Sequence, residues 1–438
     1  MKGGGERKHI LKNIHKIGLG LGALAVTASL LAMQPSAPPT EPAPAAAAMR
    51  LASLAPAARR DVDYARLDSR LQALIARPGM VGLAVGVVEN GRITFLKGYG
   101  ETHEGSGEPV TEDTVFRWAS VSKGVAATMV AKLAEQGKID LNAPVVAYAA
   151  DLKLPAGNEY RATVADLLSH RLGLYRNAYD NKLEEGIDPS MLRRSLVQLN
   201  AICAPGTCWS YQNVAYDASS EMVSKVTGLP YEIALQRLLF NPLGMAHSSA
   251  SMGALMASKS WARPHSAGRK ELPMIDTYYK VPAAGGVNSN IKDMSLWMLA
   301  QMGEMPSVLD PKLLATIHAP YVKTPTERGR LRAYLERLGD AWYGYGWRSY
   351  DYAGHRIIGH RGGINGYRSL ILFDPKKKSG VVALWNSNAS QPGGLEFEVM
   401  DQLYHLEFRD WLKLGDKEAA PPPTPLAEAE DSVSQGTG

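Results

Sequence analysis

The chain has 438 residues, of which 45% are hydrophobic, so it can form a large buried core and is neither disordered nor fibrous. The formal net charge is +5, but five of the 48 basic residues and only two of the 43 acidic residues precede Met49. The rest of the chain is nearly neutral, which argues against nucleic-acid binding.

The first part of the chain has the pattern of an export signal. A basic stretch precedes seventeen uncharged residues from Ile17 to Met33, as in a signal peptide. This run is slightly long for a cleaved signal and slightly short for a membrane span. Residues 1–33 are therefore expected to be a signal peptide or an N-terminal membrane anchor. In the second case, residues 17–33 would tether the protein to the membrane. Either form predicts an exported protein, in the periplasm or membrane-anchored and facing the periplasm.

Two segments rich in proline and alanine bound the expected catalytic domain. Residues 34–60 have the composition of an extended linker. Residues 416–438 have a similar composition and are expected to form a disordered tail. Because no repeat of fixed period lies between them, we expect one catalytic domain over residues 61–415.

The domain opens with a predicted helix and a predicted hairpin. Leucines recur at helical spacing within residues 61–76. Residues 81–89 and 92–100 are apolar-rich runs on either side of Asn90-Gly91, which is the strongest short signal for a β-hairpin.

The middle of the chain is mostly helical in pattern, and strand patterns return near its end. A helix is predicted from Ser120 to Gln136, and Thr163 and Asp166 match a capping box. Strands are predicted after Trp342, followed by a helix over residues 395–412.

This order of elements predicts an α+β fold. We expect an antiparallel sheet of about five strands, flanked by helices on both faces and completed by distant segments. Residues 61–122 and 283–415 would form an α/β lobe, and residues 123–282 a helical lobe inserted in mid-chain. The active site is expected between the two lobes.

A candidate nucleophile opens the first central helix. Ser120 and Lys123 are three residues apart, so on a helix the lysine amine lies beside the serine hydroxyl. A serine needs such a base to act as a nucleophile. The helix N-terminus also offers backbone donors to an oxyanion. Ser289 and Lys292 repeat the pattern, but they follow two glycines, and we interpret Ser289 as the cap of the next helix.

With Ser120 placed, the chain resembles the serine β-lactamase and penicillin-binding-protein family. The resemblance is to its branch of class C β-lactamases, D-Ala-D-Ala carboxypeptidases and esterases. It extends over residues 61–413 and includes GKIDLNAPV, NPLGMAHSS and AAGGVNSNIKDM. The family has three ordered motifs: S-x-x-K, Y-x-N, and K-T-G or H-x-G.

The second motif has three matches in the chain, starting at Tyr175, Tyr179 and Tyr211. The first two lie in a polar loop, where the simplest role of a tyrosine is packing and that of an asparagine is to form a turn. Tyr211 and Asn213 lie in an extended piece that leads into a helix and resembles the family, so we select them. The resemblance implies that Tyr211 shuttles protons and that Asn213 binds a substrate amide.

The third motif also has competing matches. Lys378 lies in a charged turn between two strands, and His103 lies in a polar loop before the nucleophile. His360 precedes glycines that let a substrate backbone approach a strand, so we select His360 and Gly362. The resemblance implies that the N–H groups of Gly363 and Ser120 form the oxyanion hole.

Two departures from the family pattern bear on function. The usual H-T-S-G-L segment reads H-R-L-G-L from His170, and we interpret this histidine as structural. His360 replaces a permanent cation by a group that is neutral for much of the time near pH 7. This weakens the case for a dedicated β-lactamase.

The two cysteines, Cys203 and Cys208, flank a Pro-Gly turn. In an oxidising compartment they are candidates for a disulfide that closes a small loop. Unrelated thiols and a weak metal site are the alternatives.

The resemblance implies an exported serine hydrolase that works through a Ser120 acyl-enzyme, with β-lactams or D-Ala-D-Ala-type peptides as substrates. A carboxylesterase or lactonase of the same fold, or a slow-deacylating penicillin-binding sensor, is the alternative. The expected partner is a small molecule or a cell-wall peptide. No metal or organic cofactor is implied, because the sequence has neither zinc-site spacing nor a nucleotide-binding glycine loop.

Overall fold

The computed structural model describes residues 60–415. The predicted signal or anchor, the disordered tail and all of the linker except Arg60 lie outside the described residues. Within residues 60–415, no helix has the length and apolarity needed to cross a membrane.

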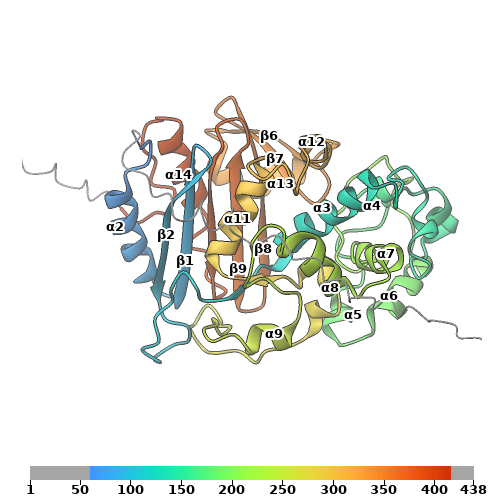
Figure 1. Cartoon of the computed structure of the whole chain (residues 1–438), viewed down its shortest axis with the longest axis horizontal. Helices are drawn as coiled ribbons and strands as arrows, with labels where there is room; N and C mark the ends of the chain where they lie inside the picture. The colour runs from blue at the N-terminus through green and yellow to red at the C-terminus, as the bar shows by residue number, and fades with distance from the viewer. Residues whose placement is uncertain (1–59, 416–438) are drawn as a thin grey trace, which may run out of the picture. The chain divides into compact units, whose positions relative to one another are not determined.

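An antiparallel sheet occupies one half of the described chain, with a mostly helical region beside it (Figure 1). It has eight strands within residues 60–415, more than the five or so expected from the sequence. Part of the difference arises near residue 342, where the aromatic segment contributes to two strands joined by a turn at Gly344 and Gly346. A further short strand at residues 322–323, which the sequence did not predict, pairs with the first of these. In spatial order the strands are β2 (Arg92–Gly100), β1 (Gly82–Glu89), β10 (Ser379–Trp385), β9 (Tyr367–Asp374), β8 (His355–Ile364), β7 (Arg348–Tyr352), β6 (Leu338–Tyr343) and β5 (Val322–Lys323).

The predicted hairpin is confirmed as β1 and β2, which pair in antiparallel register. Its turn residues Asn90 and Gly91 have φ values of 50° and 73°, a conformation that asparagine and glycine adopt most easily. β1 then pairs with β10 from the far end of the sequence. The two ends of the domain therefore complete one sheet, as the order of elements predicted.

Helices cover both faces of the sheet, as predicted. Strand residues alternate between two cores, because successive side chains point to opposite faces. Leu83, Val85 and Val87 pack in one core with helices α2 (Tyr64–Ile75) and α14 (Leu395–Leu403). Ala84 and Val88 pack in the other core with α3 (Ser122–Glu135) and α11 (Ile291–Gln301).

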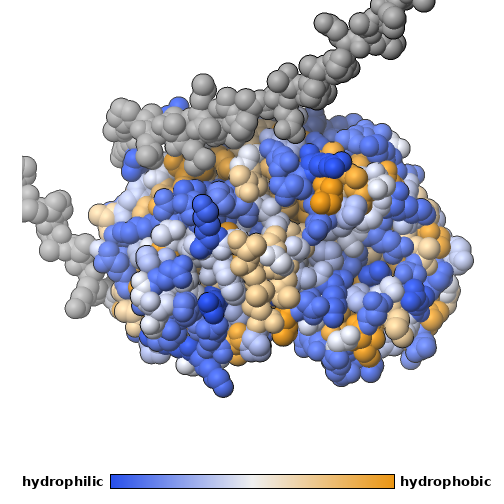
Figure 2. All heavy atoms as spheres, turned by 60° about the horizontal axis from the view of Figure 1, so that its bottom comes forward, coloured by the Kyte–Doolittle hydropathy of each residue, from blue (hydrophilic) through white to orange (hydrophobic). Residues whose placement is uncertain are grey.

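The middle of the chain adds a set of mostly short helices beside the sheet (Figure 1). The predicted capping box is confirmed at the start of α4, where the side chains of Thr163 and Asp166 each accept a hydrogen bond from the backbone N–H of the other residue. The remaining α-helices of residues 60–415 are α4 (Val164–Leu168), α5 (Asp180–Glu184), α6 (Pro189–Ser195), α7 (Ala218–Thr227), α8 (Tyr231–Leu235), α9 (Met252–Met256), α10 (Pro282–Gly285), α12 (Pro311–His318) and α13 (Pro325–Arg330). Figure 2 shows a face on which hydrophilic residues predominate and strongly apolar residues occur in small groups.

Two distant segments meet the start of α3 and so define the region of the site. A two-stranded sheet pairs β3 (Phe116–Arg117) with β4 (Asn288–Ser289) immediately before the nucleophile. On the other side, Ser369 Oγ of β9 donates a hydrogen bond of 2.6 Å to the carbonyl oxygen of Trp118. The turn that carries Ser120 is therefore held by residues about 170 and 250 positions away in the sequence.

Candidate active site

Ser120 lies in a short 3-10 helix (Ala119–Val121), just before α3 begins. Ala119 has a φ of 47°, a conformation that costs a non-glycine residue about 1 kcal/mol or more. Ser122 holds this turn: its Oγ donates to Ala119 O at 2.6 Å and accepts from the N–H of Val287 at 3.0 Å. The packed surroundings therefore maintain a strained backbone beside the candidate nucleophile.

Lys123 is fully buried, and its amine reaches Ser120. The Nζ atom lies 3.5 Å from Ser120 Oγ, 2.6 Å from Asn213 Oδ1 and 2.9 Å from the carbonyl oxygen of Ala284. A buried amine is favourable only when polar partners replace water. These contacts fix the amine next to the serine hydroxyl, which is the arrangement that activation of the serine requires.

Asn213 lies between a lysine and a carboxylate. Its Oδ1 accepts from Lys123, and its Nδ2 donates to Asp180 Oδ2 at 2.6 Å. The Lys123 amine donates to Oδ1 and a carboxylate oxygen of Asp180 accepts from Nδ2, so these neighbours determine the amide orientation. Asp180 is buried, and burial raises the pKa of its carboxyl although the hydrogen bond from Asn213 opposes that effect. Asp180 was not predicted from the sequence as part of the site.

Tyr211 packs against the buried lysine. Its ring centroid lies 4.7 Å from Lys123 Nζ and 4.4 Å from the ring of His170. The backbone carbonyl of Tyr211 accepts from the N–H of Asn177 at 2.8 Å. The alternative Y-x-N match at residues 175–177 therefore has a structural role, because Asn177 supports the backbone at Tyr211.

His170 is a buried, neutral member of the aromatic group around Tyr211. Burial, followed by the positive charges of Lys123 and Arg348, lowers its pKa well below the usual 6.5. Its Nδ1 accepts a hydrogen bond from the backbone N–H of Gln212 at 3.2 Å. These contacts fit a role in supporting the Tyr211 backbone.

His360 on β8 is buried and uncharged. Burial, together with Arg348 and Lys123, lowers its pKa well below 6.5. Its Nδ1 lies 2.7 Å from the carbonyl oxygen of Arg361, which can only accept, so Nδ1 carries the hydrogen. The other nitrogen, Nε2, accepts from the hydroxyl of Tyr343 at 3.2 Å. His360 therefore offers neither a charge nor an unengaged ring nitrogen to a substrate carboxylate.

The end of β8 presents an open edge beside the nucleophile. The pairing of β7 with β8 ends at Gly359, whereas β9 pairs with β8 as far as Ile364. A Cβ atom at Gly362 would lie 2.3 Å from the carbonyl oxygen of Trp118, so glycine permits the close packing of β8 against the nucleophile turn. The next residue, Gly363, lies opposite Arg368 of β9.

The second S-x-x-K segment is not arranged as a nucleophile and a base. Ser289 is fully buried in β4, and its Oγ donates to the carbonyl oxygen of Asn290 at 2.9 Å. Lys292 instead bonds Asp113 near the surface at 2.9 Å. The cap of α11 is Asn290, whose side chain accepts from the N–H of Asp293. The prediction that Ser289 caps this helix is wrong by one residue, because the two-residue strand β4 includes Ser289.

The alternative matches to the third motif lie elsewhere. Lys378 is at the turn between β9 and β10, is half-exposed and forms an ion pair with Glu304 at 2.5 Å. His103 lies in the loop after β2, where its backbone carbonyl accepts from Ser106. Among the described residues, neither Lys378 nor His103 has a contact that places it next to Ser120.

Arg348 was not predicted as a site residue. It begins β7 and is only 6% exposed, and its guanidinium carbon lies 5.6 Å from the Tyr211 ring and 5.4 Å from the Tyr343 ring. Glu327 of α13 lies 3.2 Å from Arg348 Nη1. The site therefore contains a permanent cation close to Tyr211.

Cys203 and Cys208 are joined by a disulfide in the structure, with an S–S distance of 1.98 Å and Cα atoms 6.2 Å apart. Within the loop, the N–H of Gly206 donates to the carbonyl oxygen of Arg171 at 2.8 Å. Only Trp209 and Ser210 separate Cys208 from Tyr211. The small loop therefore precedes the second motif directly.

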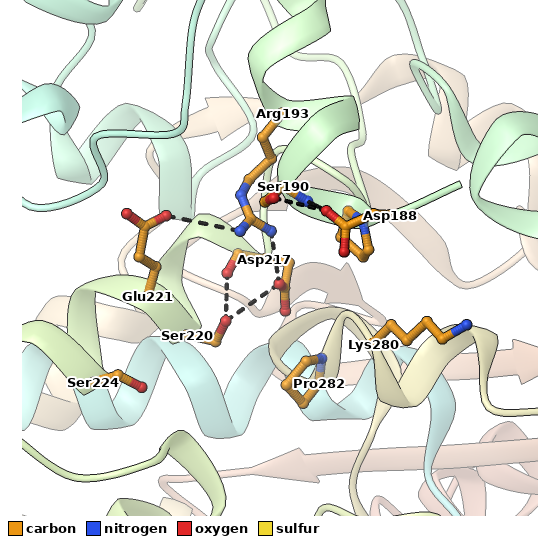
Figure 3. Close-up of a pocket in the computed structure, with 10 residues that line it drawn as sticks. Asp188, Ser190, Arg193, Asp217, Ser220, Glu221, Ser224, Lys280 and Pro282 are labelled. Carbon is orange, nitrogen blue, oxygen red and sulfur yellow. Dashed lines mark hydrogen bonds and ion pairs between the residues drawn. The ribbon is translucent and has the colours of Figure 1, made fainter. Parts of the chain in front are cut away.

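A pocket of about 460 Å³ is lined by residues of α6, α7 and the start of α10 and contains a buried ion pair (Figure 3). Arg193 reaches between Glu221 and Asp217, and its Nη1 lies 3.1 Å from Asp217 Oδ2. Burial raises the pKa of Asp217 to about 7 although Arg193 opposes that effect. The other oxygen of Asp217 accepts from the N–H of Ala283 at 3.0 Å, next to the carbonyl that receives Lys123. The pair therefore supports α10 and, through it, the lysine.

No group of three or more His, Cys, Asp or Glu side chains between residues 60 and 415 is placed to hold a metal ion. The chemistry of the site is instead that of a buried lysine beside a serine, with a tyrosine and an asparagine close by. Serine hydrolases that lack a catalytic histidine use this arrangement to make an acyl-enzyme.

The comparisons with known proteins agree with the geometry. The Beta-lactamase family model matches residues 67–404, and the chain belongs to this family of serine hydrolases. A penicillin-binding protein homologue from Pyrococcus abyssi, described as octameric, has the same fold: its TM-score is 0.71 at 24% identity, over 79% of this chain and 78% of that chain.

Curated relatives have several different names. The chain is 27% identical over 346 residues to an unguisins hydrolase of Aspergillus campestris, and this match covers 75% of this chain and 62% of that protein. It is 33% identical over 217 residues to the esterase EstB of Burkholderia gladioli, a match that covers 45% of this chain and 55% of the esterase. It is 27% identical over 366 residues to penicillin-binding protein 4 of Amycolatopsis lactamdurans, a match that covers 78% of this chain and 88% of that protein. The matches thus span about three fifths of the length of the first two relatives.

Proposed function

We propose that this hydrolase is exported and acts through an acyl-enzyme on Ser120, with β-lactams or D-Ala-D-Ala-type peptides as its substrates. The observation that carries the proposal is the fully buried Lys123, whose Nζ lies 3.5 Å from Ser120 Oγ and is held there by Asn213. If Lys123 were buried only for stability, its amine would not need to reach the Ser120 hydroxyl, which lies next to the strained backbone of Ala119.

The catalytic steps follow from this geometry. Ser120 Oγ attacks the substrate carbonyl carbon while its hydroxyl proton passes to Lys123. The bond to the leaving group then breaks as Tyr211 gives its own proton to the leaving group and is reprotonated by Lys123. A water molecule activated by Tyr211 attacks the ester carbonyl, which releases the acid and restores the Ser120 hydroxyl.

Backbone groups stabilise the oxyanion in both steps. In the proposed arrangement, the N–H groups of Ser120 and Gly363 donate to the negative oxygen, a contribution worth about 3–4 kcal/mol per donor in other enzymes. The open edge of β8 from His360 to Ile364 accepts the substrate backbone as an added strand. Asn213 has a second amide hydrogen, beyond the one donated to Asp180, for a substrate carbonyl.

An ester or lactone substrate is the second candidate, and one observation favours it. His360 is neutral and its Nε2 is engaged by Tyr343, so the third motif supplies no positive charge for the carboxylate that β-lactams and D-amino-acid peptides carry. The similarity to an esterase over 217 residues agrees with this candidate.

The test compares three acyl donors with the purified protein: a penicillin, a D-Ala-D-Ala peptide and a short-chain nitrophenyl ester. Intact mass reports the covalent adduct, and product release reports turnover. Ser120→Ala should abolish both. Ser289→Ala is the matched control, because it removes the serine of the other S-x-x-K segment, and it should leave both unchanged within about threefold.

The outcomes separate the candidates. Turnover of the penicillin or the peptide supports the proposal, whereas turnover of the ester alone supports the second candidate. A stable penicillin adduct without turnover would show a slow-deacylating sensor. Retention of labelling and turnover by Ser120→Ala would disprove the mechanism. Export is tested by fractionating cells that make the full chain, and recovery in the cytoplasm alone would contradict it.

A further inference from the structure

Arg117 in β3 is a buried arginine without a carboxylate partner among the described residues. It lies three residues before Ser120 and is only 3% exposed. The other buried arginines of residues 60–415 are Arg193 and Arg348, and each lies 3.1–3.2 Å from a carboxylate oxygen. Burial lowers the pKa of Arg117, and only tyrosines oppose this effect. The positive charge of Arg117 is therefore not compensated by an acidic side chain of the described chain.

Two of the three guanidinium nitrogens of Arg117 lack a hydrogen-bond acceptor. Nε and Nη2 are buried, and neither has a partner among the described residues. Nη1 lies 3.5 Å from the carbonyl oxygen of Ile275, at the outer limit of a hydrogen bond. The guanidinium carbon lies 4.0 Å from the ring centroid of Tyr279, but a ring face replaces only part of the hydration that a buried cation loses. Because buried donors are almost always satisfied, Nε and Nη2 require an acceptor.

The tyrosine hydroxyls near Arg117 do not supply the missing negative charge. Tyr279 Oη donates to Asn288 Oδ1 at 2.5 Å, and Tyr367 Oη donates to the carbonyl oxygen of Ala262 at 2.6 Å. Burial raises the pKa of Tyr279 to about 12 and that of Tyr367 well above the usual 10. Both hydroxyls are therefore neutral near pH 7 and already committed to other acceptors.

We propose that the guanidinium of Arg117 binds a small monovalent anion of the halide type through Nε and Nη2. These two nitrogens form one edge of the planar guanidinium, so a single ion can accept a hydrogen bond from both. One buried positive charge is compensated by one negative charge. Aromatic surroundings cannot replace the water shell of a strongly hydrated ion such as fluoride or sulfate, so the matching ligand is a weakly hydrated ion such as chloride or bromide.

An anion at this position connects the nucleophile turn to a neighbouring loop. Arg117 pairs with Asn288 across the two-stranded sheet, and the N–H of Trp118 donates to the carbonyl oxygen of Val287 at 2.8 Å. On its other side, Arg117 contacts residues 275–279 through a carbonyl and a ring. Ile275 is 47% exposed, so solvent ions reach the guanidinium by a small displacement of this loop. The proposal concerns a site separate from Ser120 and does not depend on the substrate.

Bromide is the probe for this site, because it scatters X-rays anomalously. Crystals of the protein are soaked in sodium bromide, and an anomalous difference map is measured at the bromine absorption edge. We expect a peak within hydrogen-bonding distance of both Nε and Nη2 of Arg117. Ordered water at these nitrogens without an anomalous peak, or bromide at other positions only, would overturn the proposal.

Thermal unfolding tests whether the ion is bound in solution. The measured quantity is the melting temperature of the wild type minus that of Arg117→Met, in sodium bromide and in sodium fluoride at equal ionic strength. Taking this difference removes the general effect of each salt on stability. The difference should be about 3 °C or more larger in bromide, because a ligand that binds only the folded state stabilises it.

Arg263→Met is the matched control for this measurement. Arg263 also lies over an aromatic ring, but it is half-exposed and pairs with Glu271, so its replacement should leave the response to bromide unchanged. An equal response in Arg117→Met would contradict the proposal. A peak in crystals without any shift in solution would mean an adventitious ion only and would also contradict it. If Arg117→Met does not fold, the wild-type anomalous map and the response of Arg117→Gln decide the question.

Discussion

Asn213 donates a hydrogen bond of 2.6 Å to the carboxylate of Asp180. Because the same amide accepts from Lys123, Asp180 orients Asn213 and acts on the lysine through it. The carboxylate has one buried oxygen without a hydrogen-bond partner among the described residues. This incomplete satisfaction carries a cost in stability, and it is explained by a positioning role.

Replacing Asp180 by alanine should lower kcat by about tenfold or more, since a hydrogen bond to a charged group is lost and the amide becomes free to rotate. Asp180→Asn should recover part of this loss, because an asparagine oxygen can still accept from Asn213. Asp151→Ala is a control that removes an exposed carboxylate paired with Arg194. Equal losses in Asp180→Ala and Asp180→Asn, with unchanged melting temperatures, would argue against an orienting role.

Gly362→Ala should strongly reduce activity. A Cβ atom there would lie 2.3 Å from both the Trp118 carbonyl oxygen and Ser369 Oγ, so β8 must move away from the nucleophile turn. A displacement of this kind misplaces reacting groups and costs about 100-fold in rate. Gly253→Ala in α9 is the control, because a Cβ atom there meets nothing within 4 Å. Steady-state kinetics of both variants check the prediction, and wild-type kcat/KM in Gly362→Ala would contradict it.

The disulfide should stabilise the protein and the segment that carries Tyr211. Cys203 and Cys208 are five residues apart in sequence, and closing a loop of that size is worth about 2 kcal/mol in unfolding free energy. The double variant Cys203→Ala with Cys208→Ala should lose about that amount in urea unfolding. It should also lose turnover, because Trp209 and Tyr211 become less well ordered. The prediction fails if a reductant changes neither stability nor turnover of the wild type.

Acid should destabilise the fold through a buried histidine. Burial lowers the pKa of His318 from 6.5 to about 3, so the unfolded chain binds a proton below pH 6.5 that the folded protein does not bind until about pH 3. Unfolding free energy is therefore fully retained above pH 6.5 and is lost as the pH falls, at up to about 1.4 kcal/mol per pH unit. Between pH 6.5 and 4.5 the wild type should lose about 2–3 kcal/mol more than His318→Gln.

Urea unfolding at the two pH values measures this difference. His103→Gln is the control, because His103 lies in a loop after β2. The wild type and His318→Gln would show the same pH dependence if His318 became protonated in the folded state near pH 6.

Local features of the sequence predicted several elements well. The Asn90-Gly91 turn and the capping box of Thr163 and Asp166 were predicted correctly, since both depend on residues within a few positions of one another. The sequence was less informative where a segment changes direction over a few residues. The helix predicted from Ser120 begins at Ser122 as an α-helix, and the cap predicted at Ser289 lies at Asn290.

The sequence by itself determined which residues are available for chemistry: a serine one helical turn before a lysine, and the Tyr211 and His360 segments in family order. The tertiary structure decided how these groups meet. Asp180, Arg348 and the carbonyl of Ala284 reach the site from separate elements, and no spacing in the sequence records such approaches. Only folding also shows that His360 is buried and neutral, because its charge depends on the loss of water and on two cations that distant segments bring near it.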